Sequence, residues 1–187
     1  RLGAKVILKT IADLDITTPR PVTVEKGLLT SDVNKILDDP EISIVIELIG
    51  GYEPARSFVL RAMKNKKHVI TANKALLATY GNEIFRVAEE EGVNIGFEAS
   101  VGGGIPIIRT MREGLAANRI LGIYGIINGT CNYILSRMTK EGKAFSGVLA
   151  EAQKAGLAEA DPSFDVDGID TAHKLAILVW LATGGRV

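Results

Sequence analysis

The 187-residue sequence has a single cysteine, Cys131, no net charge and no long apolar run. One thiol cannot form an intrachain disulfide, and it cannot build a cysteine-based zinc site. It fits a reducing compartment, so we expect a cytoplasmic protein. The longest apolar stretch, Leu175–Ala182, is far shorter than the ~20 residues of a membrane helix, which excludes a transmembrane span.

Lysine and arginine number 22, and aspartate and glutamate also number 22. Because nucleic-acid binding normally needs a basic surface that displaces counterions from phosphates, this balance argues against a nucleic-acid partner. The sequence lacks an initiator methionine and the long apolar segment of a signal peptide, so we expect a trimmed or truncated chain. Its 47% hydrophobic residues are typical of a globular protein with a buried core.

The first hundred residues alternate short β-rich runs with amphipathic segments. This alternation favours parallel βαβ units, and so an α/β fold with a partial, Rossmann-like doubly wound parallel sheet. The nearly continuous apolar run Ile42–Leu48 predicts a strand buried on both faces. The expected strands are Ala4–Ala12, Ile42–Leu48, His68–Thr71 and Val93–Phe97, and the expected helices are Ser31–Leu37, Pro54–Lys64 and Gly81–Glu91.

The pattern changes at the glycine-rich segment Gly102–Gly104, where we place a domain boundary. Beyond it the sequence predicts an α+β domain with more helix than strand. The expected elements are a helix near Pro106–Leu115, a strand at Ile120–Ile127 and helices near Asn132–Thr139, Phe145–Ala155 and Gly168–Leu181.

Several residues that suit a flat, hydrogen-bonding ligand stand at strand ends. Gly50 and Gly51 follow the second expected strand, and Thr71, Asn73 and Lys74 end or follow the third. Ligands of open parallel sheets collect at the carboxyl ends of the strands, where glycines allow close approach of the backbone. A lysine at a helix start opposes the helix dipole, so its pKa falls or it recruits an anion. As alternatives, the glycine pair is a simple turn and Lys74 is a solvated surface lysine.

The G-x-G-x-x-G string that normally follows the first strand of a dinucleotide-binding domain is absent. The run Ala4–Ala12 instead has the features of the second strand of such a domain, with Asp13 placed to meet the adenosine ribose hydroxyls. We therefore expect the phosphate-binding loop to lie upstream of Arg1. The chain by itself is then expected to bind the cofactor poorly.

Residues 151–174 hold six acidic side chains and two lysines. Asp170 and Lys174 are four residues apart, which places them on one helix face. Such a pair can hold an ammonium near a reacting oxygen, while Glu159 and Asp165 in the preceding loop can clasp a substrate amino group. The alternatives are an exposed helical salt bridge and an acidic calcium loop, whose spacing does not match an EF-hand.

The remaining potentially reactive side chains, two histidines and one cysteine, are assigned no role in catalysis. His68 opens an expected strand, and His173 faces away from Lys174 around its helix. Cys131 has no neighbouring base in the sequence, which argues against a nucleophilic role.

Five sequence strings together resemble the homoserine dehydrogenase family, in the same order and along the whole chain. The resemblance implies reduction of L-aspartate 4-semialdehyde to L-homoserine with NADPH or NADH, a step towards threonine, methionine and isoleucine. The strings are Glu47-Leu-Ile-Gly-Gly, Thr71-Ala-Asn-Lys-Ala-Leu-Leu-Ala, Glu98-Ala-Ser-Val-Gly-Gly-Gly-Ile-Pro-Ile-Ile, Asn128-Gly-Thr-Cys-Asn-Tyr-Ile-Leu and Ala155–Lys174.

The same resemblance implies roles for individual residues. Lys174 is the general acid/base with Asp170 as its orienting partner, and Lys74 lies between nicotinamide and substrate. Substrate-binding residues are Glu159, Asp165, Gly129 and Thr130, and cofactor-binding residues are Gly50, Gly51, Thr71, Asn73, Lys74 and Asp13. A monovalent cation, usually sodium, is held by Glu98 and by the backbone carbonyls of Val101, Gly103 and Ile105.

The resemblance also implies a homodimer of two-domain subunits. Residues 1–102 form a partial dinucleotide-binding domain, and residues 103–187 form an incomplete domain for substrate binding and dimerisation. The family's arginine near the end of the second strand appears here as Leu14, between Asp13 and Asp15. These acids would repel a 2′-phosphate, which favours NAD. The alternative function is a catalytically silent dimerising or amino-acid-binding module on the same fold.

Overall fold

The computed structural model describes residues 3–184. The ends of the two expected domains, residues 1–2 and 185–187, lie outside the described residues. The chain divides into two compact units. Unit 1 comprises Arg1–Thr71 and Asn82–Gly96, and unit 2 comprises Ala72–Gly81 and Phe97–Val187.

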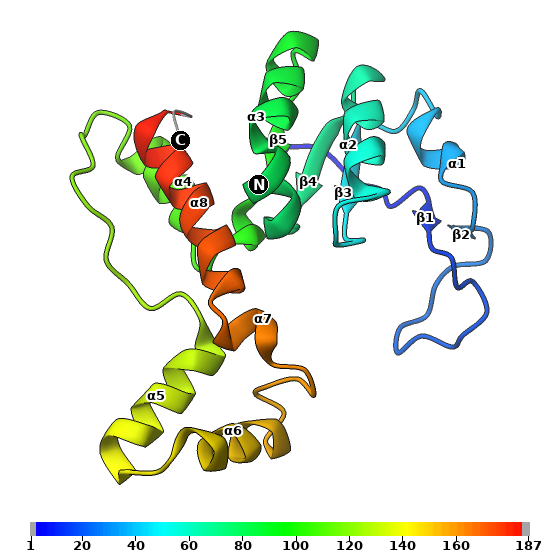
Figure 1. Ribbon diagram of the computed structural model, residues 1–187. Helices are drawn as coiled ribbons and strands as arrows, with labels where there is room; N and C mark the ends of the chain where they lie inside the picture. The colour runs from blue at the N-terminus through cyan, green and yellow to red at the C-terminus, as the bar shows by residue number, and fades with distance from the viewer. Residues whose placement is uncertain (1–2, 185–187) are drawn as a thin grey trace. The chain divides into compact units, whose positions relative to one another are not determined.

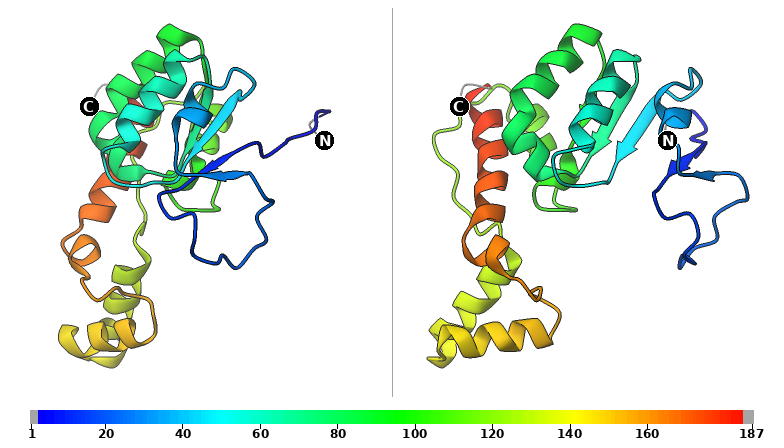
Figure 2. Two further views of the ribbon diagram at one scale, coloured as in Figure 1. Left: turned by 90° about the vertical axis from the view of Figure 1, so that its right-hand side faces the viewer. Right: turned by 45° about the vertical axis from the view of Figure 1, so that its right-hand side comes forward.

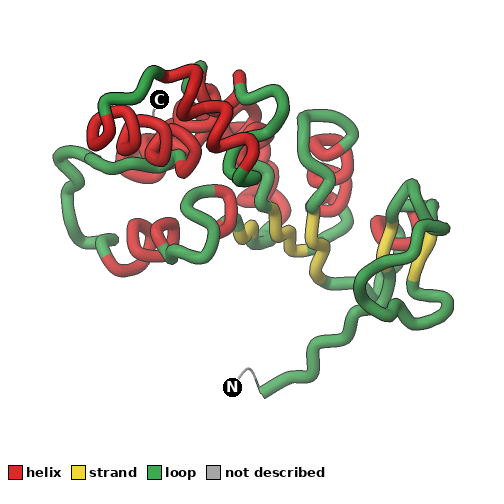
Figure 3. The backbone as a smooth tube through the Cα atoms, turned by 90° about the horizontal axis from the view of Figure 1, so that it is seen from below, coloured by secondary structure: helices red, strands yellow, loops and turns green. Residues whose placement is uncertain are grey.

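Unit 1 is built on a three-stranded parallel sheet. Its strands β3 (Ile44–Glu47), β4 (His68–Thr71) and β5 (Ile95–Gly96) lie in sequential order, as the yellow segments of Figure 3 show. The helix α2 (Ala55–Lys64) connects β3 to β4, and α3 (Lys74–Glu91) connects β4 to β5. Parallel strands joined by helices confirm the expected α/β class.

Only one face of this sheet is covered within the described residues. Val69 is buried, whereas its neighbour Ile70 and the β3 residues Ile44 and Ile46 are exposed. The expected burial of Ile42–Leu48 on both faces is therefore wrong here. The physical reason is that α2 packs against β3 and β4 from one side, which leaves the alternate side chains of each strand in solvent.

A second, two-stranded parallel sheet pairs β1 (Ile11–Ala12) with β2 (Leu29–Thr30). A short helix, α1 (Asn34–Leu37), follows it (Figure 1). The expected strand Ala4–Ala12 is formed only over its last two residues, and the apolar side chains of residues 6–8 are exposed. No described strand pairs with residues 4–10, so that part of the run lacks the hydrogen bonds of a β ladder.

Unit 2 is helical in the described residues. Its helical hairpin, α5 (Gly129–Glu141) and α6 (Phe145–Lys154), encloses a small core of Ile134, Val148, Ala152 and Ala158, and Figure 2 shows the two helices side by side. The remaining elements are η1 (Glu98–Ser100), α4 (Ile107–Arg109), the π-helical turn η2 (Thr110–Gly114), α7 (Ser163–Val166) and α8 (Ile169–Thr183).

The expected strand Ile120–Ile127 is wrong. Residues 119–128 carry no regular secondary structure, and Leu121, Tyr124 and Ile126 are strongly exposed. A β-prone segment becomes a strand only when a neighbour supplies backbone partners, and no described residue does so. Residues 103–184 therefore form helices without the β part of the expected α+β domain.

Other helix boundaries differ from the expected ones because of local capping interactions. The helix α3 begins at Lys74 rather than Gly81, since the Asn73 side chain accepts the Leu76 N–H at 3.1 Å and starts the helix. The short helix α7 was not predicted. Within the described residues, every helix is too short or too polar to cross a membrane.

Candidate functional site

The site of unit 2 centres on the buried carboxylate of Asp170. Asp170 lies in the first turn of α8, where a negative charge suits the helix dipole. Its Oδ2 accepts hydrogen bonds from Lys174 at 2.5 Å and from Asn128 at 2.8 Å, and its Oδ1 lies 3.2 Å from the Lys74 ammonium. One carboxylate thus joins α8 with the first residue of α3 and with the N-cap residue of α5.

Lys174 lies one turn along α8, so the predicted i,i+4 pair is formed. Its side chain is only 17% exposed and that of Asp170 is 6% exposed, which rules out an exposed surface salt bridge. The Lys174 ammonium also donates to the Ile127 carbonyl at 2.7 Å. Because an ammonium has three N–H donors, one remains to meet a ligand oxygen.

The Asp170 carboxyl is held in its charged form by its neighbours. Burial opposes ionisation, but hydrogen bonds from Lys174, Asn128 and Lys74 outweigh it and lower the pKa of Asp170 below its ordinary value. Asp170 therefore remains a carboxylate at neutral pH. It stabilises the positive charge of both lysines.

Lys74 is the first residue of α3, where its charge opposes the helix dipole. Asp170 supplies the anion that this position was expected to recruit, so Lys74 is not a solvated surface lysine. The ammonium also lies 5.6 Å from the centre of the Phe164 ring, within range of a cation–π contact. Phe164 in turn packs against His173, with 5.6 Å between the ring centres.

Asn128 is a residue of this site that sequence reasoning missed. Its Oδ1 accepts the Cys131 N–H at 2.7 Å and caps α5. Its Nδ2 donates to Asp165 at 2.7 Å as well as to Asp170. The available signal was an asparagine directly before a helical run, which is a strong N-cap. The sequence did not show that the same side chain reaches two carboxylates.

Cys131 lies beside the same carboxylates. Its thiol donates to the Asp165 carbonyl at 3.2 Å. Burial, followed by the charges of Asp165 and Asp170, raises the pKa of the Cys131 thiol. The thiol therefore stays protonated at neutral pH, which opposes a nucleophilic role.

The structure does not bring every expected substrate residue into this cluster. The Glu159 side chain is exposed and makes no hydrogen bond to the cluster within the described residues. The Thr130 hydroxyl donates to the Leu157 carbonyl at 2.9 Å. Gly129 begins α5, next to Asn128. Asp165 is the expected amino-group ligand that does join Asp170, through the Asn128 amide.

In unit 1, the ends of β3 and β4 are tied together by Glu47, another residue without an assigned role. Its buried carboxylate accepts the N–H groups of Ile49 at 2.7 Å and Gly50 at 3.1 Å, and the Thr71 hydroxyl at 2.5 Å. Gly50 and Gly51 both have positive φ, so glycine is required there for the turn. The Thr71 hydroxyl is thus directed at Glu47 within the fold.

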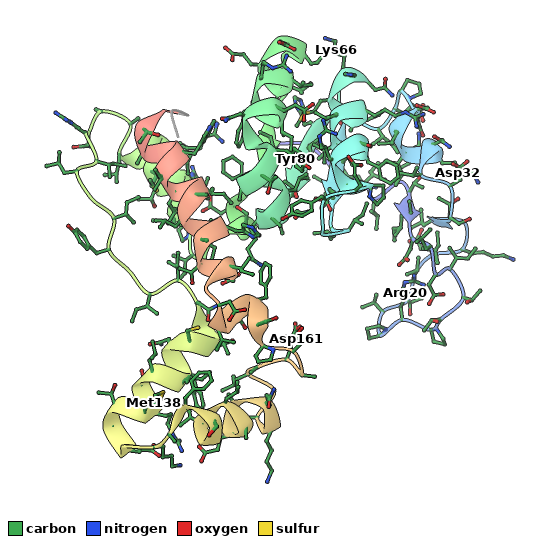
Figure 4. All side chains as sticks on the ribbon, in the orientation of Figure 1. Arg20, Asp32, Lys66, Tyr80, Met138 and Asp161 are labelled. Atoms are coloured by element: carbon green, nitrogen blue, oxygen red, sulfur yellow. The ribbon has the colours of Figure 1, made fainter. Side chains whose placement is uncertain are left out.

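Asp13 directly follows β1, and its N–H donates to the Thr30 carbonyl at 3.0 Å. Its carboxylate accepts the Asp15 N–H and lies 2.9 Å from Arg20, which is labelled in Figure 4. These two interactions lower the pKa of Asp13. The Asp15 carboxylate accepts the N–H groups of Thr17 and Thr18. Asp13 is therefore paired with a cation that the sequence argument did not place there.

The expected cation ligands lie around η1 and α4. The Glu98 carboxylate accepts the N–H groups of Ile108 at 2.8 Å and Arg109 at 3.0 Å, so it caps α4. The Ile105 carbonyl accepts the Ile107 N–H at 2.8 Å. No group of three or more histidine, cysteine, aspartate or glutamate side chains in residues 3–184 could hold a metal ion. A cation here would depend on one carboxylate and main-chain carbonyls.

The chain is similar to known proteins along nearly its whole length. Residues 3–98 match the family model "Homoserine dehydrogenase, NAD binding domain", and residues 106–187 match "Homoserine dehydrogenase". A homoserine dehydrogenase of Synechocystis is 54% identical over 180 residues, which are 96% of this chain and 42% of that protein. The chain thus spans less than half the length of this curated relative.

Solved structures of the same description are similar as well. The Staphylococcus aureus homoserine dehydrogenase at pH 6.0 is 45% identical with a TM-score of 0.85, over 100% of this chain and 46% of that one. A hyperthermophilic archaeal homoserine dehydrogenase in complex with NADPH is 34% identical with a TM-score of 0.70, over 75% of this chain and 43% of that one.

Proposed function

Because this chain belongs to the homoserine dehydrogenase family, we propose that it supplies catalytic groups for NAD(P)-dependent reduction of L-aspartate 4-semialdehyde to L-homoserine. The observation that carries this proposal is the part-buried group of Lys174, Asp170 and Lys74, in which one carboxylate serves two ammonium groups. Reduction of an aldehyde develops negative charge on its oxygen. Preorganised ammonium groups stabilise that charge and deliver a proton to it.

In this mechanism the nicotinamide supplies the hydride that reaches the aldehyde carbon. Lys174 directs its remaining N–H at the substrate oxygen and gives up a proton as the alkoxide forms, and it takes the proton back in the oxidation direction. Asp170 orients Lys174 through their hydrogen bond. Lys74 adds a second positive charge beside the same carboxylate.

The substrate amino group would bind Asp165, whose carboxylate is fixed by Asn128. Glu159, Gly129 and Thr130 complete the proposed substrate set on the strength of their place in the matched sequence. The proposed cofactor residues are Gly50, Gly51, Thr71 and Asp13 in unit 1 and Asn73 and Lys74 in unit 2. Their support is the family match and their place at or beside strand ends.

Replacing Lys174 tests the catalytic assignment. In a form of the protein extended to the length of its relatives, Lys174→Ala should lower the rate of hydride transfer by roughly 10²- to 10⁴-fold, the usual contribution of a general acid. The rate is followed by NADPH or NADH absorbance, with folding checked by circular dichroism. The control Lys140→Ala removes an exposed lysine near the end of α5. Undiminished turnover in Lys174→Ala would reject the role of Lys174, whereas no turnover in the unsubstituted protein would favour the silent amino-acid-binding module.

We also propose that Arg20 allows NADPH to bind beside Asp13. The acids at this corner favour NADH, but the Arg20 guanidinium lies 2.9 Å from the Asp13 carboxylate and offsets its charge. A guanidinium can bind a 2′-phosphate through charge-assisted hydrogen bonds. The archaeal relative solved in complex with NADPH supports use of this cofactor in the family.

Arg20→Ala should therefore raise the KM for NADPH by about tenfold or more while changing the KM for NADH little, because a hydrogen bond to a charged group contributes ~1.5–3 kcal/mol. Steady-state kinetics with both cofactors measure the ratio of the KM for NADPH to the KM for NADH. Arg86→Ala, which removes an exposed guanidinium paired with Glu90 on α3, is the matched control. An equal change for both cofactors would refute selective binding by Arg20.

A monovalent cation, sodium, is proposed at Glu98 and the carbonyls of Val101, Gly103 and Ile105. Oxygen donors fit a hard cation, and each Glu98 oxygen keeps a lone pair beyond its capping bond. If this is correct, sodium chloride should raise the thermal unfolding midpoint above that in tetramethylammonium chloride at equal ionic strength. Identical midpoints in the two salts would argue against the site.

We further propose a homodimer, as the resemblance implies. The segment 120–127 exposes Leu121, Tyr124 and Ile126, and contiguous apolar surface of this kind marks association sites. Light scattering should give the mass of two subunits. A measured mass equal to that of one subunit at micromolar concentration would overturn the proposal.

A further inference from the structure

We propose that Asn128 is a positioning residue whose side-chain amide holds the carboxylates of Asp165 and Asp170 side by side and thereby fixes the geometry of the site. The inference rests on the proposed function and deepens it. In the proposed site, Asp165 meets the amino group of the substrate and Lys174, oriented by Asp170, meets its reacting oxygen. Asn128 would set the spacing between these two points of attachment.

The Asn128 amide is buried and all its principal hydrogen-bonding capacity is used. One N–H of Nδ2 points to Asp165 at 2.7 Å and the other to Asp170 at 2.8 Å, while Oδ1 accepts the Cys131 N–H at 2.7 Å. Asn128 is 6% exposed, so water does not readily replace any of these partners. The amide therefore links Asp165, Asp170 and the main chain of Cys131.

The two carboxylates come from different elements, α7 and α8, and their charges repel one another. An amide with two N–H donors between them offsets this repulsion at close range. Without it, the Asp165 side chain would have to turn away or one carboxyl would have to take up a proton. Either change would alter the distance between the amino-group ligand and Lys174.

The N-cap of α5 locks the orientation of the amide. A flipped amide would place its carbonyl oxygen against two carboxylates and leave the Cys131 N–H without its acceptor. Folding of α5 and alignment of the two carboxylates are thus set by one side chain. A substitution at this position that caps the helix equally well but lacks N–H donors therefore tests the alignment of the carboxylates without removing the cap of α5.

Removal of the amide donors also has an electrostatic signature at Asp170. The charged and titratable groups that face Asp170 are Lys174 on α8, Lys74 on α3, Asp165 on α7 and Cys131 on α5. Burial opposes ionisation of Asp170, and Asn128 is one of three donors that lower its pKa. Loss of this donor should therefore move the pKa of Asp170 upward.

The experiment compares Asn128→Ser and Asn128→Asp in the form extended to the length of the relatives. Serine and aspartate are N-caps as good as asparagine, so α5 is retained. Neither can donate to both carboxylates, and aspartate adds a third negative charge. Each variant should lower kcat/KM by about 10- to 100-fold, because hydrogen bonds from a neutral amide to charged carboxylates are lost. The acid limb of the pH profile should move to higher pH.

The control is Asn132→Asp, one turn further along α5. Asn132 is exposed, and its side chain faces the Ser136 hydroxyl rather than the two carboxylates. The substitution Asn132→Asp adds one negative charge near the start of α5, as Asn128→Asp does, but at a position that does not contact Asp165 or Asp170. Activity within twofold of the unsubstituted enzyme and an unchanged pH profile are expected for this control.

A readout independent of catalysis separates this inference from the proposed function. Carbon-13 NMR of labelled aspartate should show that Asp170 titrates at higher pH in Asn128→Ser than in the unsubstituted protein. That shift is expected even if the unsubstituted protein shows no turnover. An unchanged titration of Asp170, or a rate loss that matches only the fraction of unfolded protein, would overturn the positioning role.

Discussion

The buried negative charge of Asp170 is the constraint on which the rest of unit 2 depends. A carboxylate that loses water must be compensated by donors, and here the donors come from α8, from the start of α3 and from the N-cap of α5. These three contacts fix where Lys174, Lys74 and Asn128 lie. Without the carboxylate, two ammonium groups would face each other without a counter-charge.

Unit 1 contains a second buried carboxylate, and the comparison separates a structural role from a chemical one. Glu47 is compensated by two main-chain N–H groups and the Thr71 hydroxyl, all of which are neutral and fixed by the fold. Asp170 is compensated largely by ammonium groups that can exchange protons. Clusters of the second kind occur preferentially at functional sites, because their charges respond to a reacting ligand.

Local patterns predicted the parts of the site that depend on helix periodicity. The spacing of Asp170 and Lys174 sets their contact within one turn of α8, so the sequence was sufficient. The contacts of Asp170 with Asn128 and Lys74 span 42 and 96 positions, and no local pattern indicated them. Similarly, α2 was predicted nearly to the residue, whereas the strand Ile120–Ile127 failed because a strand needs a partner from elsewhere.

The sequence alone determined the family of this chain, the α/β class of its first part and the acid–base pair on its last long helix, since each of these rests on order or short spacing along the chain. Only the tertiary structure decided that Arg20 pairs with Asp13, that Glu98 caps α4 and that Asn128 connects two carboxylates. Those contacts require distant segments to meet, or a backbone turn to present its N–H groups. The sequence shows many polar side chains without distinguishing them. Burial and the need to compensate charge decide which of them form these contacts.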